Sequence, residues 1–124
     1  MTTQEPTTWI IEGTFFGKPV TLEAHAQRYT DNGRIALPMF REDEDGEESL
    51  FSVLTVNVPR IALEDTQIII DPNVTKDTLS MVVDSGLIDP APVAEVQVGM
   101  ATAKVYNLTA DGAKWATTTA TDQF

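Results

Sequence analysis

Residues 20–27 read Val20-Thr21-Leu22-Glu23-Ala24-His25-Ala26-Gln27, and apolar and polar side chains alternate along the whole stretch. A period of two residues is typical of a β-strand that has one buried face and one exposed face. Because a strand must pair with neighbours, this stretch indicates a fold built on a β-sheet. The buried face is expected to carry Val20, Leu22, Ala24 and Ala26, and the exposed face Thr21, Glu23, His25 and Gln27.

The segments on either side of this strand predict its neighbours. Residues 9–12 are apolar except for Glu12, and Gly17 in the connection at residues 16–19 suits the first central position of a tight primed turn, which predicts a hairpin. Asn32 and Gly33 give a second turn signal, because both tolerate the positive φ angles of a type I′ turn. A third strand is predicted over residues 34–40.

The remaining strands follow from similar signals. Residues 50–58 read as a strand, and the acidic run before it, residues 42–48, reads as a long hairpin loop held out in solvent by mutual repulsion. The continuously apolar run at residues 67–71 is expected to be a central strand covered on both faces. Residues 94–98 and 101–108 predict a last pair, with a bulge or turn at Gly99.

One helix is predicted, over residues 75–85. Thr75 can cap it, Asp77 lies in its first turn, and Gly86 follows it at a position where a left-handed conformation is usual. Apolar residues recur at helical spacing, and this face is expected to pack against the strands at residues 50–58 and 67–71. The expected contacts join Leu79, Val82 and Val83 to Leu54, Val56, Ile68 and Ile70.

These elements predict a single α+β domain at residues 9–110, with a mainly antiparallel sheet of five to seven strands and one helix packed on it. A length of 124 residues and a hydrophobic content of 42% suit one domain with its own core. Residues 1–8 are expected to be a flexible N-terminus. Residues 111–124 lack periodicity and are expected to be a polar, frayed tail.

Charge is the strongest functional signal. The chain has 19 Asp and Glu against eight Lys and Arg, for a formal net charge of −11. Such a chain repels nucleic acid and anionic membranes, so the expected partner is a basic protein surface. The predicted contact residues are the carboxylates of the acidic run, namely Glu42, Asp43, Glu44, Asp45, Glu47 and Glu48.

Trp115 is the other candidate contact residue. It lies in the predicted polar tail, after Lys114, where it either folds back onto the domain or stays exposed to meet a partner. The other aromatic residues lie in or beside predicted strands, where core packing is the usual role.

The sequence lacks the residues that most catalytic and cofactor-binding sites require. Cysteine is absent, so thiolate nucleophiles and disulfides are excluded, and this composition suits a cytoplasmic location. Neither a signal peptide nor a membrane span is expected. His25 is the single histidine and reads as a plain strand residue. No phosphate-binding glycine motif occurs, so no cofactor is expected.

No metal site is expected either. An EF-hand register that uses Asp43, Asp45 and Gly46 puts Arg41 and Ser52 where Asp and Glu are required. Weak divalent-cation binding by the acidic run stays an alternative to a merely solvated loop.

Short motifs resemble a family of small uncharacterised bacterial proteins that are carried on conjugative elements, plasmids and phages. The resemblance covers about residues 9–108 and rests on the Gly17-Lys18 hairpin, Asn32-Gly33-Arg34, Thr55-Val56-Asn57-Val58-Pro59 and Ser85-Gly86-Leu87-Ile88. It implies a setting among mobile genetic elements. It carries over no catalytic residue.

Three functional hypotheses follow from these observations. The first is a non-catalytic acidic interaction protein of a mobile element that binds and blocks a basic host or defence protein. The second is a small enzyme with a carboxylate-based site, which would require converging carboxylates in an apolar cleft. The third is an acidic accessory protein with a purely structural role, in which the net negative charge only keeps the protein soluble.

Overall fold

The computed structural model describes residues 8–15, 17–42 and 45–120. Within them the chain forms an α+β fold of nine strands and two helices, in which all strand pairing is antiparallel. The predicted fold class is therefore confirmed, with more strands and one more helix than expected. The strands are β1 (Thr8–Phe15), β2 (Lys18–His25), β3 (Gln27–Arg28), β4 (Ile35–Ala36), β5 (Pro38–Glu42), β6 (Glu48–Val53), β7 (Gln67–Ile70), β8 (Ala94–Val98) and β9 (Ala101–Asn107).

The largest sheet has four strands in the order β1-β2-β5-β6. The predicted hairpin between β1 and β2 is confirmed. Because Phe15 pairs with Lys18, Gly17 occupies the second turn position and not the first, and its φ is +76°. The third predicted strand is divided into β4 and β5. The break falls at Leu37, whose backbone N–H donates to Thr55 Oγ1 and whose carbonyl accepts from the Leu54 N–H, so this residue pairs outside the sheet.

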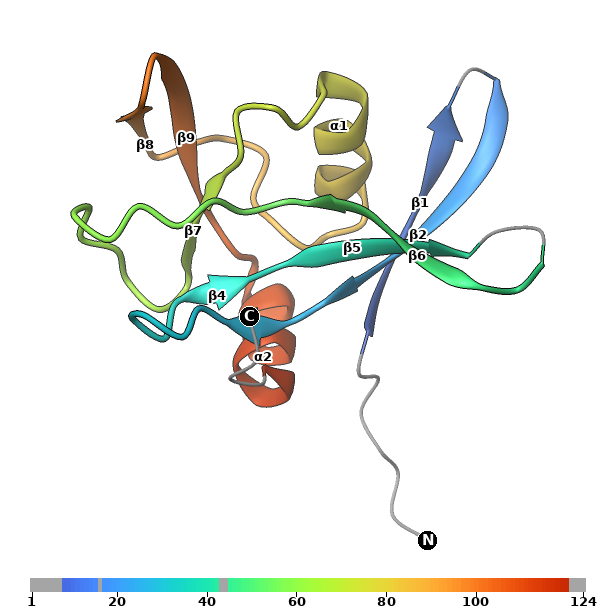
Figure 1. The fold of residues 1–124 in the computed structure, drawn as a ribbon, viewed down its shortest axis with the longest axis horizontal. Helices are drawn as coiled ribbons and strands as arrows, with labels where there is room; N and C mark the ends of the chain where they lie inside the picture. The colour runs from blue at the N-terminus through green and yellow to red at the C-terminus, as the bar shows by residue number, and fades with distance from the viewer. Residues whose placement is uncertain (1–7, 16, 43–44, 121–124) are drawn as a thin grey trace, which may run out of the picture.

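A three-stranded sheet, in the order β7-β9-β8, forms the other side of the molecule (Figure 1). The predicted last pair of strands is confirmed as β8 and β9, and Gly99 turns between them with φ of +63°. β7 is covered on both faces as expected, because Ile68 and Ile70 line the main core while Ile69 lines a second cluster with Val58. It lies at the edge of its sheet, where residues 54–56 run along its free side.

The predicted helix is α1 (Lys76–Asp84). The Oγ1 of Thr75 accepts a hydrogen bond from the Thr78 N–H, and Gly86 follows the helix with φ of +82°. Val82 is fully buried in the main core, whereas Leu79 and Val83 are half-buried against it. Of the four strand residues that were expected to contact this helix, Val56 packs instead against the second cluster.

The prediction of a frayed tail was wrong, because residues 110–119 form a second helix, α2 (Ala110–Thr119). Thr109 caps it: its Oγ1 accepts from the Gly112 N–H and donates to the Gly86 carbonyl oxygen. The two helices lie on opposite sides of the molecule, α1 above the long strands and α2 below them in Figure 1. None of the helices in the part of the chain that the structure describes could span a membrane.

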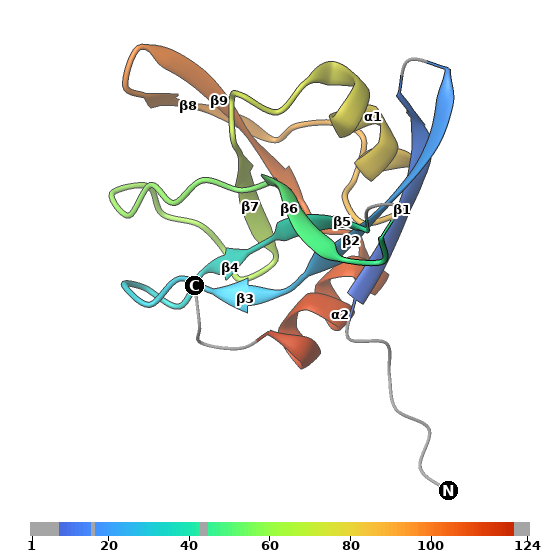
Figure 2. The same cartoon turned by 45° about the vertical axis from the view of Figure 1, so that its right-hand side comes forward.

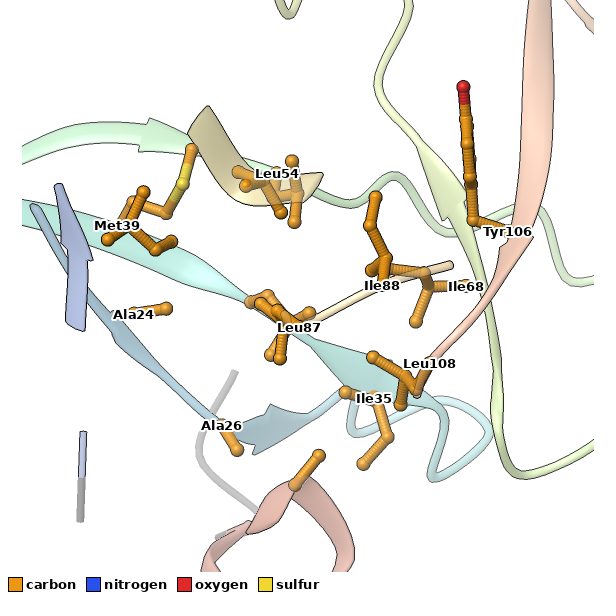
Figure 3. Close-up of a cluster of buried hydrophobic side chains, with 14 of the residues drawn as sticks. Ala24, Ala26, Ile35, Met39, Leu54, Ile68, Leu87, Ile88, Tyr106 and Leu108 are labelled. Atoms are coloured by element: carbon orange, nitrogen blue, oxygen red, sulfur yellow. The ribbon is translucent and has the colours of Figure 1, made fainter. Parts of the chain in front are cut away.

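Leu87 and Ile88, directly after α1, form the centre of the main core. Both are at most 1% exposed. Figure 3 shows Leu87 in the middle of side chains from the first sheet, including Ala24 and Met39, with Ile88 turned toward Tyr106 and Ile68. The link between α1 and β8 therefore fills the space between the two larger sheets. The predicted flexible residues 1–8 lie outside the described residues except for Thr8, which begins β1, and so do residues 121–124 of the predicted tail.

Candidate functional site

The four-stranded sheet has one face on the main core and one face open to solvent. Ile11, Leu22 and Met39 are fully buried on the core side. Because side chains alternate along a strand, their sequence neighbours point the other way. We call this open side the outer face, and its residues include Ile10, Glu12, Glu23, His25, Phe40, Glu42, Glu48 and Leu50.

An apolar row crosses the outer face from one edge strand to the other. Ile10 pairs with Glu23, Glu23 with Phe40, and Phe40 with Leu50, so the row is apolar on β1, β5 and β6 and is interrupted by Glu23 on β2. Ile10 and Leu50 are 46% and 57% exposed. Exposed apolar side chains grouped inside a polar rim are typical of contact surfaces.

Carboxylates surround this row. Glu12, Glu42 and Glu48 are exposed, and Glu23 is half-buried within the row itself. None of the positions that alternation assigns to this side of β1, β2, β5 and β6 is Lys or Arg within the described residues. The outer face therefore combines negative charge with apolar area.

The predicted acidic loop is shorter than expected and continues directly into this face. Glu42 ends β5 and Glu48 begins β6, and the two residues pair across the strands. Asp45 and Glu47 are exposed in the connecting turn. The other two predicted contact residues, Asp43 and Glu44, lie outside the described residues.

The outer face is curved, and its curvature brings β2 and β6 together. β5 lies between these strands, yet Nε2 of His25 on β2 lies 3.1 Å from Oε1 of Glu48 on β6. A register shift between Met39 and Phe40 marks a bulge, and bulges bend a strand and increase its twist. Figure 2 shows β6 as a strongly curved strand. The ring of Phe40 packs against the imidazole in a T-shaped arrangement, with 4.8 Å between ring centroids.

His25 is more than the plain strand histidine that the sequence indicated. Besides Glu48, it has Glu23 on the same face two residues earlier on β2. One nitrogen of the imidazole and one oxygen of each carboxylate all lie within 4.8 Å of one another. These three residues form a cluster of potential metal ligands on paired strands of the sheet.

Trp115 is not available as an exposed contact residue. It lies in α2, is 6% exposed, and packs against Trp9 with 5.5 Å between ring centroids. The alternative in which it folds back onto the domain is confirmed, because α2 needs this large apolar side chain to dock on the core. Its assignment to the binding surface is corrected accordingly.

The sequence missed the apolar half of the outer face. Alternation in residues 20–27 correctly assigned Glu23 and His25 to the open side. Phe40 and Leu50 could not be added, since their position depends on cross-strand register and not on any local pattern. Ile10 and Glu12 could have been found by extending the period of two through β1.

The converging groups do not lie in an apolar cleft such as the enzyme hypothesis requires. His25 and Glu48 have side chains that are 34% and 45% exposed. A separate cavity of about 180 Å³ lies between α1 and the three-stranded sheet, with Leu79, Tyr106 and Lys104 in its lining. The one carboxylate among its lining residues is Asp71.

Comparison of the chain with protein-family models, curated proteins and solved structures finds no match. The resemblance to proteins of mobile elements, which rests on short motifs, therefore stays a prediction.

Proposed function

We propose that this protein is a non-catalytic binding module whose outer face takes up a basic segment of a partner protein. The observation that carries the proposal is the composition of that face: an apolar row from Ile10 to Leu50 lies among four glutamates. A surface that is acidic only for solubility needs no exposed Ile or Leu among its carboxylates.

The chemistry of the face specifies the partner. An apolar row inside a charged rim favours a segment in which Lys or Arg flank apolar side chains, since the apolar contacts supply affinity and the charges supply orientation. The net charge of −11 disfavours nucleic acid and anionic membranes as direct ligands.

Occupation of a basic surface has a functional consequence. Basic surfaces on proteins commonly bind nucleic acid, so a module that covers one competes with that binding. In the mobile-element setting that the motif resemblance implies, the target would be a nucleic-acid-binding host or defence protein, and the module would act by blocking it.

A defined probe peptide tests the proposal in place of the natural partner. The probe is a synthetic amphipathic helix of Lys, Leu and Ala, and its control is a scrambled peptide of the same composition without an apolar face. We expect the amphipathic peptide to bind more tightly, and its amide chemical-shift changes to fall on β1, β2, β5 and β6. Shifts spread evenly over all acidic surfaces would contradict the proposal.

Two variants with equal charge separate the outer face from net charge alone. Each removes four carboxylates and changes the net charge from −11 to −7. The face variant is expected to lose affinity for the probe several-fold more than the control variant, and equal losses would show that only overall charge matters. The face variant carries E12Q, E23Q, E42Q and E48Q, and the control variant carries E64Q, D65N, D89N and E95Q.

A third variant tests the apolar row. Replacing Ile10 and Leu50 by Thr keeps a residue that suits a strand and removes the exposed apolar area. We expect this variant to bind both peptides equally weakly. If the amphipathic peptide keeps its advantage, the apolar row plays no part in recognition.

A further inference from the structure

Three side chains with metal-ligating atoms meet on the outer face. Glu23 and His25 are separated by one residue on β2, so their side chains project from the same side of the strand. Glu48 reaches them from β6, and one ligating atom of each residue lies within 4.8 Å of the other two. All three positions belong to paired strands and not to a loop.

We propose that Glu23, His25 and Glu48 form a binding site for a divalent transition-metal ion, with Zn²⁺ as the expected ligand. This inference is independent of the proposed partner binding, because the ion needs no second protein.

The spacing of the ligating atoms suits such an ion. Around a tetrahedral Zn²⁺ with bonds of about 2.1 Å, neighbouring ligand atoms lie about 3.4 Å apart. His25 Nε2 and Glu48 Oε1 are already 3.1 Å apart. Glu23 would have to close the rest of the distance, which requires only rotation about its side-chain bonds and no movement of the strands.

The ligand types favour transition metals over Ca²⁺ and Mg²⁺. Ca²⁺ and Mg²⁺ prefer sites made of oxygen atoms, whereas an imidazole nitrogen with two carboxylates suits Zn²⁺, Co²⁺ or Mn²⁺. Three protein ligands leave at least one coordination position for water or an incoming ligand. The partial exposure of His25 and Glu48 leaves that position accessible to solvent.

The surroundings hold the site in place before an ion arrives. The edge of the His25 ring rests against Phe40, with the two ring planes 80° apart. This contact restricts rotation of the imidazole. Glu42, which pairs with Glu48, adds negative potential at the site, although it is not one of the three clustered groups.

Metal titration of the untagged protein tests the proposal. His25 is the only histidine of the chain, so every imidazole NMR signal reports on this site once any histidine tag has been removed. We expect Zn²⁺ to bind with a stoichiometry of one by calorimetry and to shift the His25 ring signals. Co²⁺ should give visible absorption bands with the intensity of a four- or five-coordinate ion.

Single variants identify the ligands. H25Q, E23Q and E48Q should each lower the affinity for Zn²⁺ by about tenfold or more, whereas E42Q removes a neighbouring charge and should lower it less than threefold. Circular dichroism verifies that each variant is folded. Titration with Mg²⁺ measures attraction to the acidic surface alone.

Two results would overturn the proposal. The first is Zn²⁺ binding no tighter than Mg²⁺ binding. The second is equal effects of H25Q and E42Q, which would reduce the cluster to a hydrogen-bonded His–Glu pair on an acidic surface. Either result would leave the probe-peptide experiments unaffected, so failure of the metal site is distinguishable from failure of the binding function.

Discussion

The indole of Trp9 in β1 lies 5.5 Å from the indole of Trp115 in α2, centroid to centroid, with the ring planes inclined by 57°. The Nε1 of Trp9 also donates a hydrogen bond to Ser85 Oγ, at 3.1 Å, just after α1. Through Trp9, β1 therefore contacts α2 and the residue that follows α1. A tilted aromatic pair contributes about 0.5–1.5 kcal/mol beyond the area it buries.

Two replacements of Trp115 should differ strongly in cost. Trp115→Ala leaves a large cavity and should lower the free energy of unfolding by about 3–5 kcal/mol. Trp115→Phe should cost far less, because no described atom accepts a hydrogen bond from the buried Trp115 Nε1, and an unsatisfied buried donor costs about 1–3 kcal/mol. Urea unfolding followed by circular dichroism measures both. Equal costs would mean that the Nε1 has an acceptor after all.

Gly112→Ala should destabilise the protein although it replaces glycine inside a helix. A β-carbon at this position would overlap the carbonyl oxygen of Leu87 and lie 3.0 Å from Thr109 Oγ1. The backbone of Leu87 cannot move without disturbing the main core, so we expect a loss of about 1–3 kcal/mol. Thr118→Ala, at an exposed position of α2, is the control and should change stability by no more than about 0.5 kcal/mol. A gain in stability for Gly112→Ala would show that α2 is only loosely docked.

Glu42→Gln should stabilise the protein at low salt. Glu42 and Glu48 pair directly across β5 and β6, and like charges in such a pair repel. Removing one of them should raise the free energy of unfolding by about 0.2–1 kcal/mol. The gain should shrink at about 1 M salt, where charges are screened beyond about 3 Å. Glu12→Gln is the matched control, because Glu12 pairs with the neutral Thr21. An equal gain in the control would point to net charge rather than to this pair.

Ionisation of Tyr29 should make the free energy of unfolding fall more steeply at alkaline pH than it does in a variant without the phenol. Burial raises the pKa of Tyr29 above its ordinary value of 10.0, and the Asp71 carboxylate adds to this, while the hydrogen bond with Thr55 acts in the opposite direction. The folded state therefore favours the neutral phenol. Its contribution is fully present below about pH 10 and is lost as the pH rises through the raised folded pKa.

The test compares unfolding free energies at pH 8 and pH 11 in the wild type and in Tyr29→Phe. At pH 8 the variant should be less stable by about 1 kcal/mol for its lost hydrogen bond. Between the two pH values the wild type should lose more stability than the variant. Parallel losses would show that the Tyr29 phenol does not drive the change.

The elements that the sequence predicted are those with local signals. Thr75, Asp77 and Gly86 mark both ends of α1 within the helix itself, and the alternation in residues 20–27 gives β2 and its open face. The second helix begins with a similar signal, Thr109 as cap and Asp111 in the first turn, but no glycine marks its end, and Gly112 and several Thr residues are weak helix formers. Trp115 and Ala116 face the core only once α2 has docked beside Leu87, which is a contact between distant parts of the chain.

The candidate site divides in the same way. The acidic run was visible as a charge pattern, but its position on the outer face depends on the pairing of β5 with β6. The meeting of His25 with Glu48 depends in addition on the bulge in β6, where Phe51 is the extra residue opposite Met39 and Phe40. No single-sequence pattern specifies a register between strands, so the apolar row and the Glu23, His25 and Glu48 group could only be found in three dimensions.

The position of β7 between two clusters determines how the domain must open. Ile68 and Ile70 line the main core while Ile69 lines the smaller cluster, so this four-residue strand contributes side chains to both clusters. Displacement of β7 would expose both clusters to water at once. The backbone amides of β7 should therefore exchange their hydrogens with solvent only through unfolding of the whole domain, which makes this short strand its slowest-exchanging segment.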